Sequence, residues 1–151
     1  MTEGRGGDRW TVAARRVYAA DDAQRERVAE QVRAELAGDA AVVFAYLYGS
    51  FVEGGPFRDV DVGVYVEAAE PGQASAKALD LSGRLSDRVG LPVDVRVLNG
   101  APVPFLFHVL RGRLLLSRDD ARLEDLIERT AHRYLDIAPV LRRSAKDAFA
   151  A

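Results

Sequence analysis

The chain has 151 residues, enough for one domain with a buried core and too few for two full domains. Hydrophobic residues make up 48% and charged residues 29%, a balance typical of globular domains rather than of disordered or membrane chains. The formal net charge is −2, with 21 basic and 23 acidic side chains, so no excess positive potential draws the chain to nucleic acid and no direct nucleic-acid binding is expected.

The N-terminal segment, residues 1–20, is predicted to be flexible, because Gly4, Gly6 and Gly7 stand among charged residues. Trp10 is expected to be its first anchored side chain. The segment lacks the apolar stretch of a signal peptide, and no later apolar run approaches the roughly 20 residues of a membrane span. Cysteine is absent, which excludes disulfides, thiolate metal sites and cysteine nucleophiles and fits a reducing compartment. We therefore expect a cytoplasmic protein without a membrane anchor.

Residues 21–118 are predicted to form the core of the domain. Asp21 and Gln24 have the spacing of a capping box, and apolar residues then recur at helical spacing until Gly38. Residues 41–48 are almost all apolar, as in a strand that is buried on both faces in the middle of a sheet. Further helices are expected at 73–89 and 102–110, and further strands at 59–66, 92–98 and 113–116.

Two of the predicted strands alternate between apolar and polar residues. In 59–66, four valines are expected to pack on one face and to leave the other face polar. This polar face carries Asp59, Asp61, Gly63 and Tyr65. In 92–98, three valines alternate in the same way, and Asp94 occupies the polar face.

Residues 119–151 are predicted to form C-terminal helices, packed on the core or on a partner. Apolar residues recur at helical spacing through 119–137, and Pro139 is expected to break or kink the chain before a last helix over 140–149. The succession of strands and helices indicates an α+β or α/β fold with helices packed on one face of the sheet.

Three aspartates are the candidate metal-binding residues. Asp59 and Asp61 are two positions apart, so a strand places both carboxylates on one side, and Asp94 lies on the polar face of a later strand. Gathered carboxylates repel one another and are costly to desolvate unless a cation compensates them, which indicates a hard divalent metal such as Mg²⁺. Metals held in this way can activate a nucleophile and neutralise a pyrophosphate leaving group, so the pattern indicates phosphoryl chemistry.

Gly49 and Ser50 are the candidate phosphate-binding residues. They follow the buried strand that ends at Tyr48, where a glycine allows a close turn of the backbone. The hydroxyl of Ser50 and the N–H groups of a following short helix could then hold phosphate oxygens.

Each of these features has a simpler explanation when it is taken alone. A Gly-Ser pair is usually only a turn, two aspartates on one face suit a solvent-facing sheet, and Asp94 could merely pair with Arg96. Arg58 and Arg96 are expected to be solvated. His108 and His132 have no carboxylate or serine at catalytic spacing, so packing or surface roles are expected and no Ser-His-Asp triad is supported. The order of the three features along the chain favours the functional interpretation.

Two stretches of the chain resemble a known family. Residues 47–66 read LYGSFVEGGPFRDVDVGVYV, which resembles the G-S…D-x-D signature of the DNA polymerase β nucleotidyltransferase superfamily, and most of all its minimal nucleotidyltransferase (MNT) branch. Residues 93–119 read VDVRVLNGAPVPFLFHVLRGRLLLSRD and are similar to the same branch. The resemblance implies a polymerase-β-like α+β fold, with a small mixed sheet, helices mainly on one face and C-terminal helices.

The MNT branch includes antitoxins paired with HEPN ribonuclease toxins, some of which transfer AMP from ATP to a tyrosine of the toxin. By resemblance, Gly49 and Ser50 would bind the triphosphate, and Asp59 and Asp61 would bind Mg²⁺. Asp94 would complete the site and help to deprotonate the acceptor hydroxyl. The resemblance therefore implies an adenylyltransferase antitoxin, with a HEPN-type toxin as its partner in a homo- or hetero-oligomer.

The chain departs from the commonest form of the family at the loop before the first aspartate. This loop has fewer residues than is common in the family, and Arg58 stands where a serine often precedes the first aspartate. Two alternative functions stay open: a nucleotidyltransferase that modifies small molecules, like the aminoglycoside-modifying enzymes, and a catalytically silent module that neutralises a toxin by docking. The toxin role itself is not expected, because neither histidine lies four to six residues after an arginine.

Overall fold

The computed structural model describes residues 11–13, 16–68 and 70–149, so Trp10 lies outside the described residues. The helices are α1 (Asp22–Ala37), α2 (Ser50–Glu53), α3 (Pro71–Val89), α4 (Val103–Leu110) and α5 (Asp120–Phe149). The strands are β1 (Thr11–Ala13), β2 (Val17–Ala19), β3 (Val42–Tyr48), β4 (Val60–Val66), β5 (Val93–Val97) and β6 (Arg113–Ser117). Among the described residues, no helix has both the length and the apolar character to cross a membrane.

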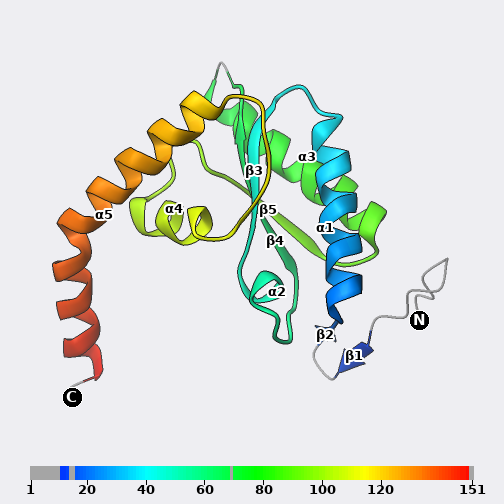
Figure 1. Ribbon diagram of the computed structural model, residues 1–151, viewed down its shortest axis with the longest axis horizontal. Coiled ribbons are helices and arrows are strands. Elements are labelled where there is room, and N and C mark those ends of the chain that lie inside the picture. Colours follow the sequence, from blue (N-terminus) through cyan, green and yellow to red (C-terminus); the bar gives the residue numbers. More distant parts are fainter. Residues whose placement is uncertain (1–10, 14–15, 69, 150–151) are drawn as a thin grey trace.

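The central sheet has four strands in the order β5-β4-β3-β6. β4 and β5 run parallel, whereas β3 is antiparallel to both β4 and β6, so the sheet is mixed and the predicted α+β class is confirmed. Helices α1 and α3 cover one face, and α4 and the first half of α5 lie on the other (Figure 1). The second face is therefore covered more fully than the sequence suggested.

Strand β3 is the most buried element of the sheet. All seven of its residues are buried, as expected for a central strand that contacts helices on both faces. Helix α1, which packs beside it, begins at the predicted capping box: the Gln24 N–H donates to the Asp21 carboxylate, and the Asp21 N–H donates to the Gln24 side chain, both at 2.8 Å.

Strand β4 has one wholly apolar face, as predicted, and a second face that is polar only at its start. Its valines are at most 1% exposed and pack towards α1 and α3. On the other face Gly63 is buried, and an added Cβ there would lie 2.7 Å from Cγ1 of Val109 in α4. The expectation of a polar face along the whole strand was wrong, because α4 packs on Gly63 and the ring of Tyr65 lies against Phe44 and Arg122.

The N-terminal segment contains a hairpin of β1 and β2. Tyr18 in β2 pairs with Phe57: the Tyr18 N–H donates to the Phe57 carbonyl at 2.7 Å, and the Phe57 N–H returns a bond of 3.1 Å. Their rings stack with centroids 5.8 Å apart. The predicted flexibility of residues 1–20 therefore does not hold for residues 17–19, which are paired to the loop before β4.

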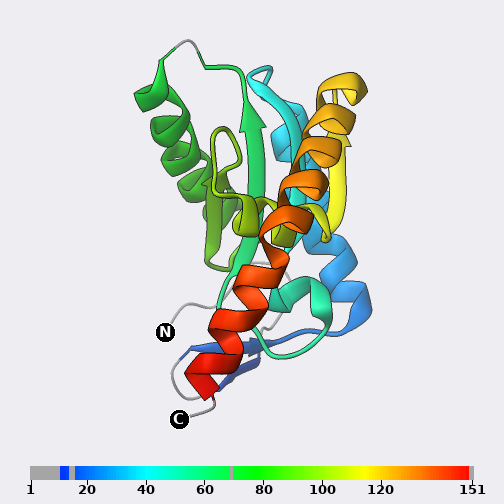
Figure 2. The same cartoon turned by 90° about the vertical axis from the view of Figure 1, so that its left-hand side faces the viewer.

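The C-terminal residues form one helix rather than two. Of the two outcomes predicted for Pro139, a break or a kink, the break does not occur: α5 continues through Pro139, and its ribbon bends between its orange and red parts (Figure 1). A proline inside a helix removes one hydrogen bond and crowds the carbonyl four residues earlier, which bends the helix without ending it. The first half packs on α4, with the rings of Phe107 and Tyr134 stacked. The second half extends past the end of the sheet (Figure 2), and Leu135 is 70% exposed.

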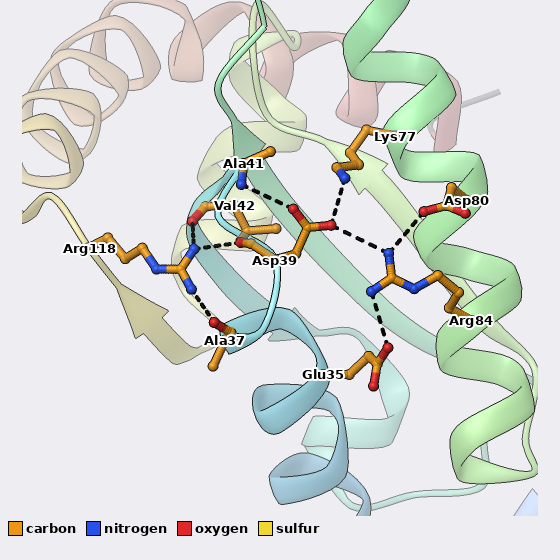
Figure 3. Close-up of polar contacts among 9 residues, drawn as sticks. All are labelled: Glu35, Ala37, Asp39, Ala41, Val42, Lys77, Asp80, Arg84 and Arg118. Carbon is orange, nitrogen blue, oxygen red and sulfur yellow. Dashed lines mark hydrogen bonds and ion pairs between the residues drawn. The ribbon is translucent and has the colours of Figure 1, made fainter.

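A network of charged side chains ties the turn between α1 and β3 to α3 (Figure 3). At its centre is Asp39, which is 9% exposed and accepts from Lys77 at 2.6 Å, from Arg84 at 3.4 Å and from the Ala41 N–H at 3.0 Å. Burial by itself raises the pKa of Asp39, but the hydrogen bonds from Lys77 and the Ala41 N–H outweigh it, so the pKa is lowered. The network thus favours the charged carboxylate.

Replacing Asp39 with asparagine is expected to lower the free energy of unfolding by about 3 kcal/mol, because Lys77 and Arg84 lose a buried counter-charge. A group whose pKa is lowered by folding stabilises above its ordinary pKa, and this contribution is lost as the pH falls. Urea unfolding at pH 7 and at about pH 3, which is below the ordinary carboxyl pKa of about 3.9, should therefore show a smaller effect at the lower pH. Asp80→Asn is the matched control, since Asp80 contacts the same Arg84 but is 55% exposed and should contribute about 0.5 kcal/mol. Equal effects of the two substitutions would contradict the prediction.

Candidate functional site

The turn after β3 brings the backbone against the side chain of Asp61. Gly49 has φ 81° and ψ −163°, a conformation that is open essentially only to glycine. An added Cβ at Gly49 would lie 2.5 Å from Oδ2 of Asp61. Both the backbone conformation and the close approach therefore require a glycine at this position.

Helix α2 begins directly after this turn, as the sequence predicted, but it is only one turn long. The N–H groups of Val52 and Glu53 both donate to the Gly49 carbonyl at 3.1 Å, so these two donors are used within the turn. Ser50 is half-buried and lines a cavity, described below. Its hydroxyl is thus placed at the edge of an open space next to Asp59.

The three predicted aspartates come together at one end of the sheet. Asp61 in β4 faces Asp94 in the parallel strand β5, and residues that face each other on neighbouring strands point to the same side. Asp59 precedes β4 and points to the same side as Asp61. One carboxylate oxygen from each lies within 4.8 Å of the others, and all three residues are half-buried. The predicted convergence is confirmed.

The negative charges of the three aspartates repel one another. Burial raises the pKa of Asp61 to about 7, with the negative charges of Asp59 and Asp94 adding to the effect. Tyr48 faces Asp61 across the antiparallel pair, and its pKa is raised by burial and then by the charge of Asp61. The site therefore holds more negative charge than its own surroundings compensate.

This set of donors suits a hard divalent cation. Mg²⁺ prefers oxygen ligands and is commonly held through one or two carboxylates, with its other positions open to water and phosphate. Asp59, Asp61 and Asp94 supply carboxylate oxygens at mutually close positions, and a cation among them would relieve the repulsion that raises the pKa of Asp61. The residues present therefore fit the metal that the sequence analysis expected.

Asp94 also pairs with Arg96, which is the simpler role that the sequence had left open for it. The Nε atom of Arg96 lies 3.1 Å from Oδ2 of Asp94, and the side chains of Arg96 and Asp94 are 61% and 40% exposed. The Arg96 guanidinium also lies 5.9 Å from the ring centre of Phe105. The pair occupies one oxygen of Asp94, and a carboxylate has acceptor positions for a second partner.

A cavity of about 410 Å³ lies beside Asp59, the only one of the three aspartates that lines it, and its size is within the usual range of small-molecule sites. It is lined by Val17, Ser50, Pro56, Phe57, Arg58 and Asp59. Arg58 is exposed, as expected, but it also faces this cavity. Val17 was not predicted to belong to the site, because β2 lies in the segment that was predicted to be flexible. The adjacent Val17 and Tyr18 were the local sign of a strand there.

Comparisons with known proteins agree with this geometry. The family model described as "Polymerase beta, Nucleotidyltransferase" matches residues 30–121. No curated protein sequence matches the chain significantly.

Solved structures share the fold at low sequence identity. One is that of a tri-AMPylated Shewanella oneidensis HEPN toxin in complex with MNT antitoxin, with 17% identity, a TM-score of 0.61, and 84% of this chain and 99% of that chain covered. Another is the toxin-antitoxin MntA-HepT, with 15% identity, a TM-score of 0.53, and coverage of 83% and 99%. A third is a toxin-antitoxin with AMP-PNP, with 18% identity, a TM-score of 0.56, and coverage of 80% and 98%.

Proposed function

Because the chain belongs to the polymerase beta nucleotidyltransferase family, we propose that it is an MNT-type antitoxin that transfers AMP from ATP to a cognate HEPN ribonuclease toxin. The acceptor in this proposal is a hydroxyl group of the toxin, most simply that of a tyrosine. The observation that carries the proposal is the meeting of three aspartates beside the Gly49-Ser50 turn and a cavity large enough for a nucleotide. The protein would act in the cytoplasm, where ATP and the toxin are found together.

Each residue of the site has a proposed role. Gly49 and Ser50 hold the triphosphate, with Ser50 at the mouth of the cavity. Asp59 and Asp61 hold Mg²⁺, which when bound offsets negative charge on the phosphates. Asp94 completes the site and accepts the proton of the attacking hydroxyl, whose oxygen forms a bond to the α-phosphorus while pyrophosphate leaves.

Two observations support a HEPN-type toxin as the partner. The similar solved structures include complexes of HEPN toxins with MNT antitoxins, one of them with a tri-AMPylated toxin. In the second half of α5 the chain has three exposed apolar side chains, Leu135, Val140 and Leu141, which are 70%, 59% and 39% exposed. Apolar side chains that are exposed along an extended helix are available for contact with a protein partner.

Intact-mass measurement of the partner tests the proposal. The protein is incubated with Mg²⁺, ATP and a candidate HEPN-type partner, and the partner is expected to gain the mass of one or more AMP units. The same reaction with Asp59→Asn or with EDTA should leave the partner's mass unchanged, because the Mg²⁺ site is incomplete or empty. AMP transfer to an aminoglycoside but not to protein would favour the small-molecule alternative. Tight binding of the partner with no transfer to either acceptor would favour the silent module.

A further inference from the structure

Arg25 in α1 is bonded to the loop that follows the Gly49-Ser50 turn. Its guanidinium donates to the carbonyls of Phe51, Gly54 at 3.2 Å and Gly55 at 2.9 Å, and its Nε donates to Ala20 at 3.1 Å. One side chain thus joins three backbone carbonyls of the loop to the start of α1.

The same guanidinium also packs against two core rings. It lies 5.3 Å from the ring centre of Phe51 and 5.2 Å from that of Phe57, and these two rings meet edge to face with centroids 5.0 Å apart. Phe51 and Phe57 are 2% and 1% exposed. Arg25 is therefore held between buried aromatic rings and backbone oxygens, where its charge is compensated by the carbonyl dipoles and the ring faces.

The loop that Arg25 holds connects the two halves of the candidate site. Ser50 lies at its start and Asp59 just after its end, and both line the same cavity. Within the loop, Gly54 has φ 95° and is followed by Gly55, a pair of residues that adds backbone freedom. With the Arg25 bonds in place this freedom is restricted, and the distance between Ser50 and Asp59 is set.

We propose that Arg25 is a positioning residue of the nucleotide site, which fixes the loop from Phe51 to Phe57 and thereby the placement of Ser50 against Asp59. This inference rests on the proposed function. The four hydrogen bonds of Arg25 go to backbone carbonyls of its own chain, so its role is to position the loop rather than to contact the nucleotide. A lysine cannot replace it fully, because a single ammonium group cannot reach the same spread of carbonyls.

Steady-state kinetics of Arg25→Gln and Arg25→Lys test this role. We expect Arg25→Gln to raise the KM for Mg²⁺-ATP on the order of tenfold with a much smaller change in kcat, and Arg25→Lys to have an intermediate effect. Arg33→Gln is the matched control on the same helix, since Arg33 pairs with Glu30 and should leave the KM unchanged. If Arg25→Gln does not fold, the KM of Arg25→Lys for Mg²⁺-ATP tests the role by itself.

Amide hydrogen exchange of the free protein provides a readout that does not depend on activity. In Arg25→Gln we expect faster exchange over residues 50–57 and unchanged exchange in β3 and β4. A wild-type KM and wild-type exchange in both Arg25 variants would overturn the inference, even if the wild-type protein is an active transferase. If instead the wild-type protein transfers no AMP, the proposed function fails, and the exchange measurement still decides whether Arg25 fixes the loop.

Discussion

Asp61→Asn is expected to reduce AMP transfer by about 10³-fold and, at the same time, to make the metal-free protein more stable. A bound divalent cation contributes several kcal/mol to a phosphoryl-transfer transition state, and each 1.36 kcal/mol corresponds to a factor of ten in rate. Asparagine keeps the size of Asp61 but removes the charge that would hold the cation. The same change removes a carboxylate whose pKa is raised by burial and, in addition, by repulsion from Asp59 and Asp94.

The gain in stability should depend on pH in a defined direction. Folding raises the pKa of Asp61 to about 7, so its protonated form is stabilising below the ordinary carboxyl range, and this stabilisation is lost as the pH rises towards 7. Asparagine does not titrate, so the variant should be more stable than the wild type at pH 8, by on the order of 1 kcal/mol because water screens a half-buried group. Near pH 4 the difference should be small.

Urea unfolding in EDTA at pH 4 and pH 8, together with transfer assays, measures both effects. Added Mg²⁺ should stabilise the wild-type protein and leave Asp61→Asn unchanged, because only the wild type binds the cation. Asp80→Asn provides a control, since it removes an exposed carboxylate on α3, outside the aspartate cluster. Full transfer activity in Asp61→Asn, or a lower stability than the wild type at pH 8, would show that Asp61 does not have the proposed role.

Gly49→Ala is the second substitution for which we expect a large effect. The backbone of Gly49 is in a region that is essentially restricted to glycine, so a side chain there costs on the order of 1–3 kcal/mol of stability. The new Cβ would also meet Oδ2 of Asp61 at 2.5 Å and displace that side chain. A displacement of about 1 Å in a reacting group can reduce a rate by roughly 10²-fold, and we expect a loss of transfer of this order.

Gly100→Ala separates the two causes. Gly100 also has a positive φ, 66°, but an added Cβ there meets no atom within 4 Å. Gly100→Ala should therefore lower the free energy of unfolding and leave the transfer rate unchanged. Thermal unfolding and transfer assays of both variants provide the comparison. A Gly49→Ala protein that transfers AMP as fast as Gly100→Ala would mean that the close approach to Asp61 is not needed.

Sequence patterns predicted the elements that carry the site because those patterns are local. The capping box of Asp21 and Gln24, the all-apolar run of β3 and the alternation of β4 each depend on neighbours a few residues apart. Local patterns did not reveal what covers each surface. Gly63 was placed on a polar face and lies under α4, and the sequence left open whether Pro139 breaks or kinks a helix that continues through it.

The sequence by itself therefore determined the four strands of the central sheet, the turn at Gly49-Ser50 and the common side on which Asp59 and Asp61 lie at the start of β4. Only the tertiary structure decided that β5 pairs in parallel with β4, in the register that sets Asp94 opposite Asp61. It also decided that Arg25 reaches the loop beyond Ser50, and that β2 forms a wall of the cavity. The physical reason is that a strand's pattern records which of its faces is buried, whereas its partner and register depend on contacts between segments far apart in the chain.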